Sequence, residues 1–268
     1  MFSHPEYDGH EEVVHAYDAA SGLRAIVALH STTLGPAFGG CRMYPYADEA
    51  LALTDVLRLS RGMTYKAAIC ELPYGGGKSV VLADPRRDKS PELLRAMGRL
   101  IESLGGRYIT ADDVGTTLGD LAVMREVTRH TAGATASSQV QLAVTAYGVL
   151  MAIEAAVQHY YQRDDFGGLR FAVQGLGNVG FPLCRYLHER GAALVVTDVD
   201  PARSAEAAAE LGAEAVAPES VYDQEVDVFA PCALGAVLND RTIPRLATRL
   251  VVGGANNQLA GSGHDAAL

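Results

Sequence analysis

The stretch FAVQGLGNVGFPL, residues 171–183, decides the fold class of the second half of the chain. It contains the pattern G-x-G-x-x-G at Gly175, Gly177 and Gly180, between an apolar run typical of a strand and a segment typical of a helix. A second apolar run ends at Asp198, 18 residues after Gly180. In this context the pattern predicts a dinucleotide site, whereas the glycines alone would also fit a turn without a ligand.

Each glycine of the pattern has its own expected role. Gly175 permits a tight turn, Gly177 lets the backbone approach a pyrophosphate at the helix N-terminus, and Gly180 allows close packing of helix on strand. Asp198 is expected to accept hydrogen bonds from the adenosine ribose and to repel a 2′-phosphate. The pattern therefore favours NAD over NADP, with Arg203 as the nearby basic residue that could favour the phosphate.

Strands and helices alternate around this loop. The expected strands cover 169–174, 193–197, 226–229 and 250–252, and the expected helices cover 178–190 and 201–211. This alternation predicts a doubly wound parallel sheet, the Rossmann type of α/β fold, in a NAD-binding domain over residues 133–268. A helix over about 142–161 is expected to link this domain to the first half.

Residues 1–132 predict a separate α/β domain. Its expected strands are 12–17, 24–30 and 79–83, and its expected helices are 48–68 and 91–104. Thr117 and Asp120 form a capping box that starts another helix. The glycine-rich stretch TTLGPAFGGCRMYPY, residues 32–46, is expected to be mostly loop.

Composition excludes several classes of function. The 268 residues carry a formal net charge of −10, which disfavours a nucleic-acid or anionic-membrane surface. The four cysteines form no C-x-x-C pair and no histidine completes a metal-ligand spacing, so we expect no metal and the reduced thiols of a cytoplasmic protein. We see no secretory signal and no apolar run long enough to span a membrane.

The stretch LPYGGGKSVVL, residues 72–82, is a poor match to a nucleoside-triphosphate loop. Such a loop needs a glycine six residues before the lysine and a helix after it, but Leu72 occupies that position before Lys78 and a β-branched run follows. Two alternatives remain for this stretch alone. It is a tight glycine turn with a solvated Lys78, or a loop that places Lys78 in a site.

Further charged residues accompany Lys78. Lys66 precedes it by twelve residues, and Asp112 and Asp113 follow an expected short strand. One lysine is expected at a helix end and the other at a strand start, so both can reach one cleft. Two cations and a carboxylate there suit a small anionic substrate and proton transfer.

Taken together, the motifs resemble those of the leucine, phenylalanine and valine dehydrogenases, which belong to the amino-acid dehydrogenase superfamily and are related to glutamate dehydrogenase. The resemblance runs over almost the whole chain, through HSTTLGPAFGGCRMYPY, RGMTYKAA, GGGKSVV, RYITADDVGTT, VTAYGV, VQGLGNVG, VTDVD, APCALGAVLND and ANNQLA. It implies a homo-oligomeric enzyme that uses NAD to interconvert an L-amino acid with its 2-oxo acid and ammonia. It also implies that the first domain binds substrate and mediates oligomerisation.

Matched residue by residue, the resemblance implies roles in the reaction. Lys66 binds the substrate carboxylate, and Lys78 activates the water that attacks the imino acid. Asp113 carries a proton to or from the amino group. Gly39 and Gly40 offer backbone contacts beside the substrate.

The resemblance also implies a side-chain pocket and cofactor contacts. Phe38 and Ala111 line the pocket, and the bulk of Phe38 predicts valine or leucine in preference to phenylalanine. Asn256 or Asn257 bridges substrate and nicotinamide. The remaining residues expected to contact NAD are Thr145, Asn178, Val179, Cys232 and Ala233. Cys232 is expected to be a packed small residue rather than a nucleophile.

Two departures from the family leave an alternative function open. The segment SSQVQLA, residues 137–143, lacks the proline that usually precedes VTAYG, which bears on the placing of Thr145. The family also continues into a segment that closes the substrate pocket, whereas this chain stops at Leu268. The alternative is a NAD-binding pseudoenzyme or regulatory partner that keeps the fold without turnover. The presence of Lys66, Lys78 and Asp113 favours the enzyme.

Overall fold

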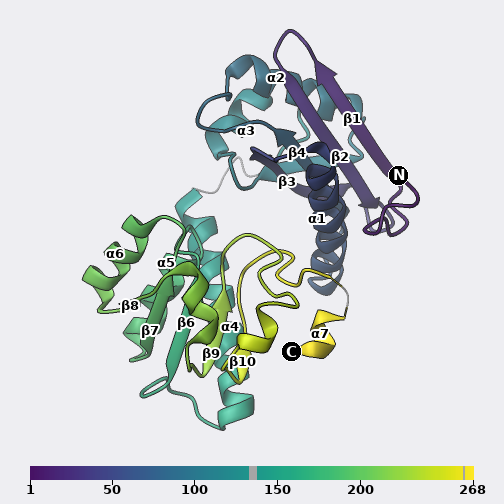
Figure 1. The fold of residues 1–268 in the computed structure, drawn as a ribbon. Helices are drawn as coiled ribbons and strands as arrows, with labels where there is room; N and C mark the ends of the chain where they lie inside the picture. The colour runs from purple at the N-terminus through teal and green to yellow at the C-terminus, as the bar shows by residue number, and fades with distance from the viewer. Residues whose placement is uncertain (133–137, 262) are drawn as a thin grey trace. The chain divides into compact units, whose positions relative to one another are not determined.

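The structure is a computed structural model that describes residues 1–132, 138–261 and 263–268 (Figure 1). The side chains of residues 138–143 lie outside this description, and with them most of the SSQVQLA segment. The chain divides into two compact units, Met1–Ala136 and Ser137–Leu268, whereas the domain boundary expected from the sequence follows residue 132. No helix among the described residues is long and apolar enough to cross a membrane.

The first unit is a five-stranded sheet with helices on both faces (Figure 1). Its strands are β1 (Glu12–Asp18), β2 (Leu23–Ser31), β3 (Ala37–Tyr44), β4 (Gly75–Leu82) and β5 (Tyr108–Asp112). Its helices are α1 (Glu49–Ile69), α2 (Pro91–Ser103) and α3 (Leu118–Met124). The strand order is β1-β2-β4-β3-β5, with β3 parallel to both β4 and β5 and β2 antiparallel to both its neighbours.

The two faces of this sheet bury separate cores. Ile26 and Val80 pack with Val56 and Leu57 of α1 on one face. The opposite face packs on α2 and α3. Because side chains alternate along a strand, the even-numbered positions of the central strand β4 face α1.

Local sequence explains where the helices begin. Asp48 caps α1 by accepting the Leu51 N–H at 2.8 Å, and Ser90 caps α2 before Pro91 at the first helical position. The predicted capping box of Thr117 and Asp120 starts α3.

The structure corrects the expected loops around the glycines. Gly75, Gly76 and Gly77 lie inside β4, and the Phe38–Gly40 stretch lies inside β3. A Cβ atom at Gly75 or Gly76 would overlap Ser31 O or Thr64 Oγ1, and one at Gly77 would lie 2.8 Å from the Tyr108 ring. These glycines are therefore strand residues that permit close packing, not turn residues.

The second unit is a five-stranded parallel sheet of order β10-β9-β6-β7-β8 (Figure 1). Its strands are β6 (Arg170–Gln174), β7 (Ala193–Thr197), β8 (Glu214–Ala215), β9 (Val228–Pro231) and β10 (Leu250–Val251). Its helices are α4 (Ser138–Tyr161), α5 (Gly180–Glu189), α6 (Pro201–Leu211) and α7 (His264–Ala267), with the 3-10 turns η1 (Pro218–Asp223) and η2 (Ile243–Arg245). Helices α4, α5 and α6 cover one face of the sheet.

The predicted α/β class and doubly wound parallel sheet are confirmed. The short strand β8 was not expected from the sequence, and other differences are at element ends. Strand β9 begins two residues later than expected, and α4 begins at Ser138 rather than near 142.

Candidate active site

Lys78 and Asp113 form an ion pair in the first unit. Lys78 lies within β4 and is only 4% exposed, while Asp113 directly follows β5. Strand β3 lies between these two strands. Both residues were predicted to act in the reaction, and the fold places their charged groups in contact.

Gly40 of β3 makes this contact possible. A Cβ atom at Gly40 would lie 2.7 Å from Asp113 Cβ and 3.2 Å from Lys78 Nζ. A side chain there would therefore occupy the space that the ion pair fills. At Gly39 a Cβ would overlap Gly77 O, so that glycine is required for strand packing.

The turn after β5 is held rigidly. The Thr116 hydroxyl donates to the Cys41 carbonyl at 2.6 Å and accepts the Asp113 N–H at 3.0 Å. Thr116 is 7% exposed. Thr116 thus links the backbone of Asp113 to Cys41 in β3, which helps to fix the position of the Asp113 carboxylate.

Arg42 is a site residue that sequence reasoning missed. It lies in β3, is 7% exposed, and its Nε donates to Asp113 Oδ2 at 3.2 Å. Its Nη1 donates to Asp55 Oδ2 at 2.8 Å, and the Tyr46 hydroxyl donates to the same oxygen at 2.6 Å. The signal in the sequence was an arginine inside the otherwise apolar run AFGGCRMY.

These cations determine the charge of Asp113. Burial works against the carboxylate, but the charges of Lys78 and then Arg42 outweigh it and lower the pKa of Asp113 to about 2. Asp113 is therefore ionised throughout the neutral and alkaline range.

Lys66 joins the same group of charges. It lies in the last turn of α1 and is open to solvent, yet enough protein surrounds its ammonium group to lower its pKa, and the charge of Lys78 lowers it further. Asp113 partly offsets this effect. The structure thus places Lys66 close enough to Lys78 and Asp113 for their charges to interact.

The two residues expected to line the side-chain pocket adjoin Gly40. Ala111 pairs with Gly40 across the β3–β5 ladder, and Phe38 lies two residues before Gly40 in β3. The half-buried Phe38 ring packs 5.3 Å from the Tyr74 ring.

In the second unit, the glycine loop has the geometry of a dinucleotide site. Gly175 has a φ of +90°, and a Cβ there would lie 2.8 Å from the Ala233 backbone. At Gly180 a Cβ would overlap Gly175 O. At Gly177 the nearest atom, Arg203 Nη1, would be 3.8 Å away. The first and third glycines are thus required by packing, and the second leaves open space for a ligand.

Asp198 lies beside this loop with its carboxylate held by backbone donors. It accepts the Leu176 N–H at 2.6 Å and the Asp200 N–H at 2.9 Å, and it is 9% exposed. Arg203 Nη1 is 3.7 Å from Asp198 Oδ2. The predicted acid and the nearby arginine therefore both flank Gly177.

The other expected cofactor residues divide into three places. Asn178 and Val179 continue the glycine loop, and Cys232 and Ala233 follow β9. Thr145 lies exposed in the first half of α4. Burial raises the pKa of Cys232 to about 11, so its thiol is protonated and packed, not nucleophilic.

The residue that precedes the ANNQLA segment lies against the glycine loop. A Cβ at Gly254, just before the segment, would lie 3.0 Å from Val179 Cγ1. Asn257 has a φ of 50°, and its Nδ2 is a buried donor without a hydrogen-bond partner. A buried donor without a partner is costly unless a ligand satisfies it, so the residues present fit a bound dinucleotide.

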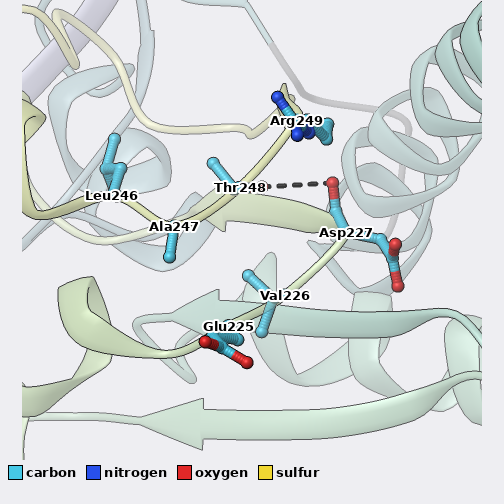
Figure 2. Close-up of a pocket in the computed structure, with 7 residues that line it drawn as sticks. All are labelled: Glu225, Val226, Asp227, Leu246, Ala247, Thr248 and Arg249. Carbon is cyan, nitrogen blue, oxygen red and sulfur yellow. Dashed lines mark hydrogen bonds between the residues drawn. The ribbon is translucent and has the colours of Figure 1, made fainter.

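A surface pocket of about 530 Å³ lies elsewhere in this unit (Figure 2). It is lined by Glu225, Val226, Asp227, Leu246, Ala247, Thr248 and Arg249. These residues precede β9 and β10, so the pocket lies at the amino ends of the parallel strands. The glycine loop lies at the opposite, carboxyl ends, because it follows β6. The Thr248 hydroxyl donates to the Asp227 carbonyl, and the Asp227 carboxylate accepts the Arg170 N–H and the Tyr161 hydroxyl. This pocket belongs to neither set of predicted residues.

Comparison with known proteins identifies the family. The family model described as "Glu/Leu/Phe/Val dehydrogenase, dimerisation domain" matches residues 10–130. A second family model, described as "Glutamate/Leucine/Phenylalanine/Valine dehydrogenase", matches residues 137–202. The chain belongs to the glutamate, leucine, phenylalanine and valine dehydrogenase family. Among its relatives, leucine dehydrogenase of Thermoactinomyces intermedius is 49% identical over 98% of this chain and 73% of its own length. L-tryptophan dehydrogenase of Nostoc punctiforme is 48% identical over 94% of this chain and 71% of its own length.

Solved structures of this dehydrogenase family show the same architecture. The crystal structure of the Nostoc punctiforme L-tryptophan dehydrogenase gives a TM-score of 0.73 at 45% identity, over 97% of this chain and 75% of that one. A hetero-hexameric glutamate dehydrogenase from Thermus thermophilus gives 0.76 at 23% identity, over 96% of this chain and 69% of that one, which supports the fold alone. The resemblance noted in the sequence is confirmed.

Proposed function

We propose that this protein catalyses the NAD-dependent, reversible oxidative deamination of an apolar L-amino acid to its 2-oxo acid and ammonia. The observation that carries the proposal is the buried Lys78–Asp113 ion pair with Lys66 beside it, in a chain of the amino-acid dehydrogenase family. The relatives named above are dehydrogenases of leucine and tryptophan, so they give no support to a pseudoenzyme.

The charged groups fit an amino-acid substrate. The Lys66 ammonium group would bind the carboxylate as a point charge. The Asp113 carboxylate would accept a hydrogen bond from the substrate amino group. Because the Asp113 pKa is about 2, this carboxylate is a good counter-charge but a weak proton acceptor, so its expected role as a proton carrier stays a prediction.

Lys78 would handle the proton of the attacking water. When bound, NAD would accept the hydride released from the substrate Cα, which leaves an imino acid. Lys78 would then take a proton from the water that attacks the imino carbon, and ammonia would leave as the 2-oxo acid forms. In the reverse direction the same amine would return that proton.

The choice of NAD rests on Asp198. Its carboxylate borders the open space at Gly177 and would accept hydrogen bonds from ribose hydroxyls, while a 2′-phosphate would meet a like charge. Arg203 is the feature that favours NADP, but its nearest carboxylate is Asp198 itself.

Two finer proposals concern size and assembly. The Phe38 ring beside Gly40 supports valine or leucine over phenylalanine as substrate. The match of residues 10–130 to a dimerisation domain supports a homo-oligomer, which light scattering would measure directly.

An absorbance assay tests the proposed function. The 268-residue protein is mixed with NAD or NADP and a panel of branched and aromatic L-amino acids at alkaline pH, and reduced nucleotide is followed at its absorption band. We expect turnover with NAD and a branched amino acid. Binding of NAD without turnover of any amino acid would support the pseudoenzyme instead.

A further inference from the structure

The Lys78–Asp113 pair is the end of a longer chain of polar contacts. Arg42 bridges two carboxylates, with Nε on Asp113 and Nη1 on Asp55. The Tyr46 hydroxyl donates to the same Asp55 oxygen that accepts Arg42. Arg42 therefore has anchors on both sides and little freedom to move away from Asp113.

Arg42 and Lys78 act on one oxygen. Both contact Asp113 Oδ2, and both side chains are almost fully buried. Burial works against the charge on Arg42, but Asp113 and Asp55 outweigh it and raise the Arg42 pKa above its already high value. An arginine in this setting stays charged at every pH at which the protein is folded.

The presence of two cations on one carboxylate oxygen matters when Lys78 changes its protonation state. The role proposed for Lys78 requires it to hold no proton at one stage of the reaction, and a neutral amine no longer stabilises the adjacent carboxylate. A buried carboxylate without a cation tends to take up a proton, and the nearest source would be the proton that Lys78 handles. A second, permanent cation prevents this transfer.

We propose that Arg42 is a positioning residue that keeps Asp113 ionised and oriented while Lys78 exchanges its proton with the substrate. The proposal rests on the reaction proposed above for this site. It assigns to Arg42 no contact with substrate. Arg42 acts through Asp113 alone, and Asp55 and Tyr46 determine the position of the Arg42 side chain.

The other titratable groups around Asp113 do not substitute for Arg42. They are Lys78 on β4, Cys41 on β3, Lys66 on α1, Tyr46 after β3 and Tyr108 on β5. Burial raises the pKa of Cys41 to about 11, and burial likewise raises the pKa of both tyrosines, so these three are uncharged. Lys66 is exposed, and its proposed role is to bind the substrate carboxylate rather than to stabilise Asp113.

Two substitutions separate the charge of Arg42 from its hydrogen bonds. Arg42→Gln keeps an N–H donor of similar reach without the charge, and Arg42→Lys keeps the charge. The direct measurement is the titration of the Asp113 carboxyl by carbon-13 NMR in aspartate-labelled full-length protein, assigned by comparison with Asp113→Asn. We expect the carboxyl to titrate higher by roughly one pH unit or more in Arg42→Gln and to stay near its native value in Arg42→Lys.

Kinetics of the same proteins add a second readout. In Arg42→Gln, kcat for the amino acid should fall by roughly tenfold or more while KM changes little, and Arg42→Lys should recover most of kcat. Equal losses of thermal stability and kcat in both variants, with an unmoved Asp113 titration, would overturn the proposal and leave Arg42 a purely structural residue.

The outcomes also separate this proposal from the proposed function. If the native protein turns over no amino acid, the reaction is wrong, yet the carboxyl titration still decides whether Arg42 controls Asp113. If Arg42→Gln fails to fold, Arg42→Met, which also lacks the charge, takes its place: a raised Asp113 titration supports the proposal, and a native-like one contradicts it.

Discussion

Lys78 on β4 and Asp113 after β5 form an ion pair across the strand between them, because Gly40 of that strand carries no side chain. Two parallel strands and their shared neighbour therefore determine which charges meet. Arg42, two residues beyond Gly40 in the same strand, adds a second cation to Asp113. One short segment of β3 thus leaves space for the ion pair at Gly40 and supplies a second cation to Asp113 at Arg42.

Replacing Gly40 with alanine tests this geometry. The new Cβ would lie 2.7 Å from Asp113 Cβ and from Asp112 O, so the turn or the ion pair must shift. A displacement of about 1 Å at such a site can lower the rate by roughly a hundredfold, and we expect kcat/KM to fall on that scale. Gly148→Ala in α4 is the matched control, because a Cβ there has no atom within 4 Å. Near-native kcat/KM in Gly40→Ala would show that the pair does not depend on the space above Gly40.

Phe38 should limit the size of the substrate. Phe38→Ala removes a ring beside Gly40 and leaves volume for a larger side chain. We expect the ratio of kcat/KM for phenylalanine to that for valine to rise by roughly tenfold, in line with about 1–3 kcal/mol for pocket contacts of this kind. Valine, leucine and phenylalanine are compared in both proteins. A native preference for phenylalanine that the substitution leaves unchanged would refute this role.

Asp198 should determine the choice of dinucleotide. Asp198→Ser removes the charge that a 2′-phosphate would meet, and also the acceptor of the Leu176 N–H, so affinity for both dinucleotides is expected to fall. The informative quantity is the ratio of the Kd for NADP to the Kd for NAD, which should fall by roughly tenfold or more. Asp200→Ser is the control, since Asp200 caps α6 and serine is also a good cap. Equal native affinity for NAD and NADP would remove Asp198 from the assignment.

The buried His10 and the half-buried His30 should make stability depend on pH. His10 is 4% exposed, accepts the Asp8 N–H at Nδ1 and donates from Nε2 to the Leu57 carbonyl at 3.0 Å, and its ring lies 4.8 Å from that of His30. Burial lowers the pKa of both histidines from 6.5, and the charge of Arg61 lowers both further, while Asp8 acts in the opposite direction.

The sign of this dependence follows from the lowered pKa values. The unfolded chain binds protons that the folded protein does not, so the contribution to stability is present above pH 6.5 and is lost as pH falls below it. The loss is at most about 1.4 kcal/mol per pH unit for each extra proton. In urea titrations between pH 7 and 5, His10→Gln should flatten the fall in unfolding free energy, and His159→Gln, an exposed position in α4, should not. An equal slope in all three proteins would contradict this account.

The sequence predicted the fold class and the glycine loop because these depend on patterns within one segment or one strand–helix–strand unit. The capping signals of α1, α2 and α3 act within a few residues of themselves, and the acid at 198 contacts the glycine loop within one strand–helix–strand unit. The charged trio of Lys66, Lys78 and Asp113 came from the family resemblance and from its place at element ends.

The errors of the sequence reading concern contacts between distant segments. Gly75–Gly77 resemble a turn in sequence, but they are strand residues whose missing side chains admit Ser31, Thr64 and Tyr108. Nothing in the local pattern reports those neighbours. Arg42 was missed for the same reason, since its partners Asp55 and Asp113 are brought to it only by the fold.

The central claim is that Lys78 performs the chemistry while Lys66 binds the substrate carboxylate. It is tested most directly by kcat and KM for L-leucine oxidation with NAD in the native protein, Lys78→Ala and Lys66→Ala. Lys89→Ala is the matched control, because that lysine pairs with Asp120 away from the site. We predict a fall in kcat of roughly two decades or more for Lys78→Ala, a raised KM for Lys66→Ala, and unchanged NAD affinity in both. Near-native turnover by the Lys78→Ala protein would contradict the account.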